Sequence, residues 1–258
     1  MRNVSIDAIE DSRSPVIAIG NVYADRLETP EHAHTRAQLL YPARGVVTVN
    51  TRQGAWVVPP ERAVWIPANT RHAARMSGQV SMCSVYIRPR TAATAGLPPT
   101  CCVVEVSPLL RALLETSIDL PLEYRRGSRE NRIMDLILDE VRAMRVLPLN
   151  APIPRCRVLA KVCTALLDEP ESDASIDALA AKLAMSRSSF TRHFRTETGM
   201  SFGRWMQQAR FLYALRRIGA GEPITRVALD CGYASPSAFT AAFRKVLGTS
   251  PSQYFAAS

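Results

Sequence analysis

Short runs of β-branched and other apolar residues dominate the first part of the chain, from about residue 14 to residue 106. Proline and glycine separate these runs, which are VIAIGNVYA, QLLYPARGVVTVN, AWVVPP, AVWIP, VSMCSVYI and CCVVEV. Many short strands at close spacing are typical of a β-sandwich or a β-barrel. Residues 1–106 are therefore predicted to form a barrel-like domain.

The pattern changes to helical periodicity after residue 106. Ser107 is placed to cap a helix that has Pro108 in its first turn. A second helix is predicted in RENRIMDLILDEVRAMRVL, whose apolar face would carry Ile133, Leu136, Ile137, Val141 and Met144. Such faces need a partner, either the barrel or a second copy of the chain. Residues 107–147 are predicted to be a helical dimerisation segment of a homodimer.

A proline-rich stretch, PLNAPIPR at 148–155, follows this segment. Three prolines in eight residues prevent a helix from continuing, so the stretch is predicted to be a linker. Residues 156–258 are predicted to be helical to the end. The predicted fold class is therefore α+β, with a sheet-rich first part and a separate all-α second part.

Two segments of the helical part are near copies. SRSSFTRHFRTETGMS, 186–201, and SPSAFTAAFRKVLGTS, 235–250, are identical at eight of sixteen ungapped positions. Each begins with a serine placed to cap a helix, has two phenylalanines four residues apart on its inward face, and ends at a glycine. Each also follows a shorter predicted helix and a tight turn, which together make a helix-turn-helix unit. One long helix, 202–221, is predicted to join the two units, so that they could read two successive major grooves of DNA.

Arginine, serine and threonine lie on the predicted outward faces of the repeated helices. Arginine can bind guanine through two hydrogen bonds, and hydroxyl groups reach base edges or phosphates. The first copy is richer in such groups, and Arg192 is the best single candidate for base readout. The second copy is expected to give backbone positioning and shape contacts. The predicted DNA-binding residues are Arg187, Ser188, Thr191, Arg192, Arg195, Ser237, Thr240, Arg244 and Lys245.

One such hairpin alone would fit an ordinary helical bundle as well as a DNA-binding domain. The charge of the chain helps to distinguish these two alternatives. The formal net charge of the 258 residues is +9, and residues 155–258 contain 14 Arg and Lys against 8 Asp and Glu. Two copies in register, together with this basic excess, favour DNA binding over a bundle with a solvated charged face.

Other features bear on the location of the protein. The chain has no apolar run of about 18 residues and no charged-then-apolar start, so neither a membrane span nor a signal peptide is predicted. Its six cysteines show no CxxC pairing and are expected to be reduced. The expected location is the cytoplasm, without a membrane partner.

Residues 155–258 resemble the DNA-binding domain of the AraC/XylS family of transcription regulators. The segment GYASPSAFTAAFRKVLGTSPSQY is similar to the C-terminal signature of that family. The resemblance implies two helix-turn-helix units on a long helix that bind double-stranded promoter DNA, with RNA polymerase as an expected partner. Ala241 departs from the family pattern, because this position often carries a polar base reader; the departure argues against base reading by the second helix.

EHAHTRAQLLYPARG, 31–45, and WVVPPERAVWIPANTRH, 56–72, resemble a cupin barrel of the kind fused to many AraC regulators. In metal-binding cupins a His-x-His pair, a carboxylate or amide and a later histidine converge inside the barrel, and the matching positions here are His32, His34, Gln38 and His72. Imidazole groups suit a divalent transition metal such as Zn or Ni. Regulatory cupins often lose the metal and bind an organic effector instead, so the sequence leaves open whether the ligand is a metal ion or an organic effector.

Taken together, these features predict a sequence-specific transcription regulator. Its parts would be a cupin-like effector barrel at 1–106, the helical segment at 107–147, the linker at 148–155 and an AraC-type double helix-turn-helix domain at 156–258. A small molecule or a metal ion in the barrel would change promoter occupancy. A metal-dependent cupin enzyme with an accessory helical domain is the alternative. No acid-base pair beside the histidines supports it, and the chain is predicted not to be an enzyme.

Overall fold

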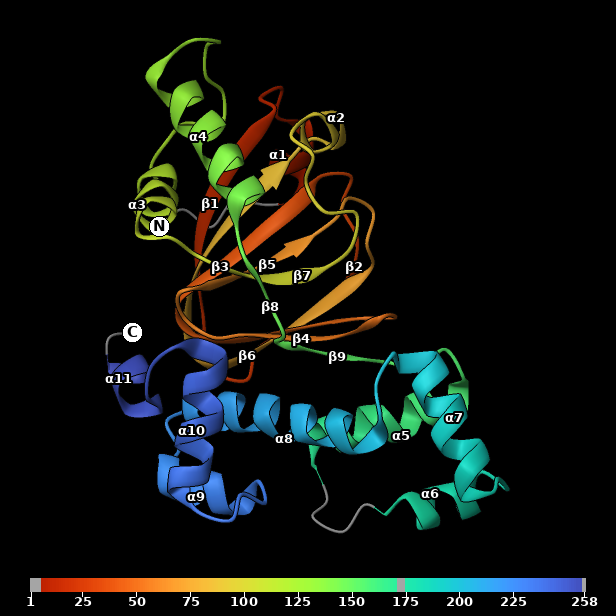
Figure 1. Ribbon diagram of the computed structural model, residues 1–258. Helices are drawn as coiled ribbons and strands as arrows, with labels where there is room; N and C mark the ends of the chain where they lie inside the picture. The colour runs from red at the N-terminus through yellow and green to blue at the C-terminus, as the bar shows by residue number, and fades with distance from the viewer. Residues whose placement is uncertain (1–5, 171–174, 257–258) are drawn as a thin grey trace.

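The computed structural model describes residues 6–170 and 175–256, and it places a sheet-rich first half above a helical second half (Figure 1). The strands are β1 Val16–Tyr23, β2 Glu28–His32, β3 Ala37–Thr51, β4 Gly54–Val58, β5 Arg62–Ile66, β6 His72–Ile87, β7 Cys102–Glu105, β8 Val146–Leu147 and β9 Asn150–Pro152. The helices of the first half are α1 Ile6–Asp11, α2 Pro89–Thr94, α3 Pro108–Ser117 and α4 Arg129–Ala143. Those of the second half are α5 Arg157–Asp168, α6 Ile176–Lys182, α7 Arg187–Thr198, α8 Phe202–Gly219, α9 Ile224–Asp230, α10 Pro236–Leu247 and α11 Pro251–Ala256. The predicted α+β class is confirmed.

Two long strands, β3 and β6, organise the sheet. They pair with each other along almost their whole length, and β6 also pairs with β1 and β2 while β3 pairs with β4 and β5. The β3–β6 register shifts between Pro42 and Arg44 and again between Arg44 and Val46. Such irregularities bend a strand and increase its twist, which lets the two long strands curve. The curvature gives the first half its barrel-like form (Figure 1).

Helices α3 and α4 cover one face of this sheet. Ser107 and Ser128 cap them, each accepting a hydrogen bond from a backbone N–H three residues on. The buried face of α4 carries Met134, Ile137, Leu138 and Val141. Leu136, predicted to share that face, is instead 39% exposed, because the inward face follows the spacing of Met134 and Ile137. The helical pair thus packs on its own barrel, and dimerisation through it stays a prediction.

The prolines of residues 148–155 predict a linker, but this prediction is wrong for part of the stretch, which belongs to the sheet. Asn150–Pro152 forms β9, which pairs with β4, and Leu149 and Ala151 are fully buried. Proline lacks an N–H donor but is tolerated at a sheet edge, where β9 lies. The apolar side chains at 149 and 151 add to the core. The sheet of the first half therefore extends to residue 152, beyond the predicted barrel boundary at 106.

The second half is built around α8. Helices α6 and α7 lie near one end of α8, and α9 and α10 lie near the other (Figure 1). The predicted caps are present, since Ser186 and Ser235 accept hydrogen bonds from backbone N–H groups, and Gly199 and Gly248 end their helices with φ of 75° and 85°. These left-handed values favour glycine.

Aromatic rings repeat the same packing in both units. Phe190 and Phe194 lie 5.7 and 5.3 Å from Phe202, and Phe239 and Phe243 lie 6.3 and 6.0 Å from Phe211, as measured between ring centroids. Each pair of phenylalanines thus attaches its helix to one part of α8. The prediction of two helix-turn-helix units on one long helix agrees with this arrangement.

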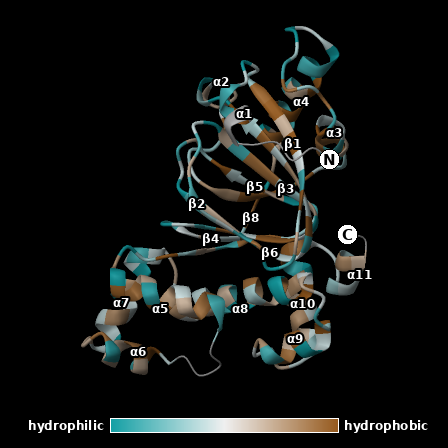
Figure 2. Cartoon of the chain, turned by 180° about the vertical axis from the view of Figure 1, so that it is seen from behind, coloured by the Kyte–Doolittle hydropathy of each residue, from teal (hydrophilic) through white to brown (hydrophobic). Residues whose placement is uncertain are grey.

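The two halves share one continuous apolar core. Helix α8 packs under β3, β4, β6 and β9. The indole of Trp205 donates a hydrogen bond to the carbonyl of Pro152 (2.8 Å). The backbone of α8 comes so close to β3 that a Cβ at Gly219 would lie 2.2 Å from Val46 Cγ2. Hydrophobic segments coloured brown in Figure 2 follow the strands and alternate with hydrophilic segments along α8. No helix in the described part of the chain is long and apolar enough to cross a membrane.

Candidate functional site

Helix α7 presents one polar face to solvent. With Phe190 and Phe194 buried against α8, the side chains on the opposite side of α7 must point outward. All five predicted DNA-binding residues of this helix are exposed and line one shallow, open hollow together with the cap Ser186; they are Arg187, Ser188, Thr191, Arg192 and Arg195. The structure therefore brings the five together, as predicted.

The arginines of this face differ in their partners. Arg187 Nη1 lies 2.7 Å from Asp177 Oδ2, on the helix that precedes the turn. Arg192 and Arg195 make no ion pair with any acidic residue in the described ranges 6–170 and 175–256. Thr191 donates its hydroxyl to the carbonyl of Arg187 (2.9 Å). Arg192 and Arg195 thus keep all their guanidinium donors available to DNA, whereas Asp177 engages Nη1 of Arg187.

Helix α10, at the other end of α8, presents a face with fewer hydrogen-bonding groups than that of α7. Ser237, Arg244 and Lys245 are exposed, while Thr240 is half-buried and donates its hydroxyl to the carbonyl of Pro236 (2.9 Å). Ala241 is exposed and has no polar group to offer. This face fits phosphate contact better than base readout.

Lys245 stands apart from the other three predicted residues of α10. It lines a separate groove beside α8 that also contains Arg145, Arg204 and Gln208. The sequence did not indicate Arg204 or Arg145, because neither belongs to the repeat. The packing of α10 against α8 brings Arg204 near Lys245, and Arg145 comes from the segment between α4 and β8.

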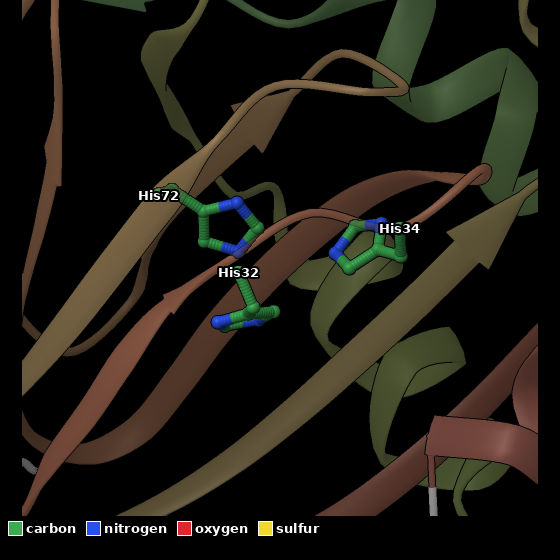
Figure 3. Close-up of side chains that lie close together, drawn as sticks. All are labelled: His32, His34 and His72. Carbon is green, nitrogen blue, oxygen red and sulfur yellow. The ribbon is translucent and has the colours of Figure 1, made fainter.

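Three histidines meet at one end of the sheet (Figure 3). His32 ends β2, His34 lies just before β3 and His72 begins β6, where its Cα pairs with that of His32. The ring centroids of His32 and His72 are 4.4 Å apart, and that of His34 lies 6.0 and 5.2 Å from them. One ring nitrogen from each histidine lies within 4.8 Å of the others.

Backbone carbonyls fix the orientation of these rings. The Nδ1 atoms of His32, His34 and His72 lie 2.9, 2.5 and 2.8 Å from the carbonyl oxygens of Pro30, Arg36 and Thr70. An Nδ1–H that donates to a carbonyl leaves the lone pair on Nε2, which is the usual preparation of a metal-ligating histidine. Burial lowers the pKa of His72 to about 4 against the opposing effect of its bond to Thr70, so its ring is neutral near pH 7.

The fourth predicted ligand, Gln38, also reaches this cluster. Its Oε1 lies 3.2 Å from His34 Nε2, and its Nε2 donates to Ser84 Oγ (3.0 Å) and Tyr86 OH (3.2 Å). A zinc ion with Zn–N bonds of about 2.0–2.1 Å would need ligand nitrogens roughly 3.4 Å apart. The histidine nitrogens, which lie within 4.8 Å of one another, would have to move closer together around an ion, and the imidazole and amide donors of the four residues are of the kind that suits a divalent transition metal. The sequence did not indicate that Ser84 and Tyr86 hold the side chain of Gln38.

Comparison with known proteins gives two family matches. The helix-turn-helix domain family matches residues 179–257, and the AraC-like ligand binding domain family matches residues 14–137. The first range contains all nine predicted DNA-binding residues, and the second contains all four residues of the histidine cluster.

Individual relatives agree with these matches. The HTH-type transcriptional regulator NimR of Escherichia coli is 29% identical across 99% of this chain and 94% of its own length. The regulatory protein SoxS of Salmonella typhimurium is 35% identical across 34% of this chain and 80% of its own. The crystal structure of ToxT from Vibrio cholerae aligns with a TM-score of 0.39 and 10% identity over 94% of this chain and 98% of that one.

Proposed function

The chain belongs to the AraC family of DNA-binding transcription regulators with an N-terminal ligand-binding domain, and from this premise we propose how it reads DNA and which ligand it binds. The predictions of family membership and of a regulator rather than an enzyme are confirmed by the two family matches and by the relatives, which are named transcription regulators. The cytoplasmic location, the homodimer and the contact with RNA polymerase stay predictions.

Helix α7 reads bases in one major groove, and Arg192 is its main base reader. The observation that carries this proposal is the exposed polar face of α7, on which Arg192 and Arg195 have no acidic partner in the described residues while Arg187 does. Helix α10 anchors the protein on the neighbouring groove. Its contacts are mainly with phosphates, through Ser237, Thr240, Arg244 and Lys245.

Affinity measurements on selected duplex DNA test this division of roles. Arg192→Ala is expected to weaken binding by about 1–3 kcal/mol, because a bidentate contact with guanine is lost. Arg244→Ala should weaken binding to all sequences alike and reduce the salt dependence by about one phosphate contact. Arg126→Ala, which removes an exposed arginine from the first half, is the matched control. Equal affinities for Arg192→Ala and Arg126→Ala would contradict the role of Arg192.

The ligand of the first half is a divalent transition metal ion, Zn or Ni, held by His32, His34 and His72 with Gln38 as the fourth ligand. The convergence of three ring nitrogens, their carbonyl-bonded Nδ1 atoms and the neutral ring of His72 support this choice over an organic effector. A bound ion would supply a positive charge that ties the end of β2 and the start of β3 to the start of β6.

Metal analysis of the purified full-length protein tests this ligand. We expect close to one Zn or Ni per chain after equilibration with the metal, and isothermal titration should show that His72→Ala no longer binds the ion. His193→Ala is the matched control, since His193 lies on α7, away from the cluster. A protein that binds neither metal, or that binds it unchanged after His72→Ala, would favour an organic effector in the barrel.

A further inference from the structure

A basic groove of about 570 Å³ lies beside α8 and α10. It is lined by α8 from Arg204 to Phe211, by α10 with the turn before it, and by Arg145 and Pro148, which flank β8 in the ligand-binding half. Figure 1 shows β8 above α8, between α7 on one side and α10 on the other. The proposed function assigns Lys245 of this groove to phosphate contact and leaves the rest of the groove without a role.

The charge of the basic groove has one sign. Four cationic side chains line it, and none of the described residues that line it is acidic; the four are Arg145, Arg204, Arg210 and Lys245. Arg145, Arg204 and Lys245 are exposed and form no ion pair with an acidic residue in the ranges 6–170 and 175–256. Cations gathered without carboxylates repel one another, so the basic groove favours an anionic partner.

The position of the basic groove indicates which anion this is. Arg204 lies in the first turn of α8, close to the end of α7 along the chain, and Lys245 lies on α10. A duplex whose successive major grooves hold α7 and α10 must pass α8 with the backbone that separates those grooves. Duplex DNA carries one phosphate charge for about every 1.7 Å of its axis. The basic groove therefore lies where a dense row of phosphates is expected.

Arg145 is the cation of this groove that comes from the ligand-binding half. Its carbonyl accepts a hydrogen bond from the backbone N–H of Glu105, at the end of β7 (2.9 Å). Gln208 of α8 donates its side-chain amide to the carbonyl of Pro148, three residues further along. These two hydrogen bonds hold the segment 145–148 between the sheet and α8. The backbone of Arg145 is thus fixed beside the helix that joins the two reading units.

We propose that the basic groove binds the DNA backbone between the two major grooves, and that Arg145 supplies a phosphate contact from the ligand-binding half. Arg204 and Lys245 contact the same stretch of backbone from α8 and α10. This placement of the backbone depends on the proposed reading by α7 and α10, which brings the duplex to α8. The ligand-binding half thus takes part in DNA binding itself, and a ligand that moves its sheet relative to α8 also moves a DNA contact.

The salt dependence of DNA affinity in the full-length protein counts the phosphate contacts. The slope of log K against log salt changes by about 0.9 for each contact on duplex DNA, so Arg145→Ala should lower its magnitude by about 0.9. Arg145→Lys keeps the charge and should keep the slope. Arg142→Ala is the matched control, because Arg142 is an exposed arginine in the last turn of α4 that does not line the basic groove. Base preferences should be the same in all three variants.

Ethylation of single phosphates locates the contact on the duplex. Ethylation removes the charge of one phosphate and weakens binding where that phosphate is contacted. For the unmodified protein, the sensitive phosphates should include some between the two major grooves. For Arg145→Ala, at least one of these should no longer be sensitive, because its partner is absent.

Three results would overturn the proposal. A salt slope that Arg145→Ala leaves unchanged would show that Arg145 does not touch DNA and that the basic groove serves a different anion. An equal loss for Arg142→Ala would show a general effect of net charge. Identical ethylation patterns for the unmodified protein and Arg145→Ala would exclude a contact between the major grooves. Because Arg192 is tested by base preference and Arg145 by salt slope, failure here is distinct from failure of the proposed base reading.

Discussion

Asp177 competes with DNA for Arg187, and removing its charge is expected to strengthen DNA binding. The carboxylate lies in the first turn of α6 and the arginine at the first position of α7, with 2.7 Å between Nη1 and Oδ2. A phosphate that accepts a hydrogen bond from Nη1 of Arg187 has to compete with Asp177 for that donor. Asp177→Asn removes the competing charge and keeps the size of the side chain.

The structure sets the size of the effect. Both side chains are 65% exposed, and ion pairs as exposed as this contribute about 0–1 kcal/mol. Releasing Arg187 should therefore raise DNA affinity by up to about fivefold. The same substitution removes a negative charge from the N-terminus of α6, which should lower the free energy of unfolding by roughly 0.3–1 kcal/mol. Affinity and stability are thus expected to change in opposite directions.

Fluorescence anisotropy with a labelled duplex measures the affinity, and urea unfolding measures the stability. Asp139→Asn, an exposed carboxylate on α4, is the matched control and should change neither quantity appreciably. In the double variant with Arg187→Ala, the gain in DNA affinity from Asp177→Asn should shrink, because the arginine that this substitution releases is no longer present. If Asp177→Asn bound DNA more weakly than the unmodified protein, Asp177 would be orienting Arg187 in the complex and the reasoning would be refuted.

Three further outcomes follow from the packing and from the histidine cluster. Phe243→Ala should lower the free energy of urea unfolding by about 3–5 kcal/mol, since the ring is fully buried and packs on Phe239 and Tyr254; a loss below about 1 kcal/mol would contradict this core. Arg62→Ala should speed hydrogen exchange in α10 and α11, because Arg62 donates to the carbonyl of Leu247 and lies over the ring of Tyr254; unchanged exchange would show that these contacts do not hold the second unit. Removing Zn with EDTA should lower the thermal midpoint, by the equivalent of about 2.7 kcal/mol if the metal had been present at 100 times its Kd, and a midpoint insensitive to metal would count against the site.

The repeated units could be predicted from the sequence because their signals are local. A capping serine, two phenylalanines four residues apart and a terminal glycine lie within sixteen residues, and the structure uses each of them in the same way in α7 and α10. The contacts between these features act inside one helix and its nearest neighbour. Most of the fold of the second half could therefore be predicted from the sequence.

The edges of the sheet could not be read in the same way. Strand β2 has no buried alternation, and β9 is only three residues long and ends in Pro152, so the sequence pattern indicates a strand in neither place. Both are strands because a partner already in place, β6 or β4, supplies the hydrogen bonds. The misassigned linker follows from the same cause, since prolines suit a sheet edge as well as a loop.

Contacts between distant residues also escaped prediction. The approach of His32 to His72 across 40 positions was expected from a family resemblance, because spacing alone cannot show it. Nothing in the sequence indicates that Asp177 binds Arg187 across the turn, or that Trp205 donates a hydrogen bond to the carbonyl of Pro152. Such pairs depend on how whole elements pack, which only the structure describes.

Selection of binding sites from a random duplex pool, carried out with the unmodified protein and with Arg192→Ala, tests the central claim most directly. The proposal that α7 reads bases predicts that the unmodified protein enriches one motif in which a guanine is strongly preferred at one position. Arg192→Ala should enrich the same motif with that preference relaxed and the positions facing α10 unchanged. The same base preferences at every position in both selections would contradict the account.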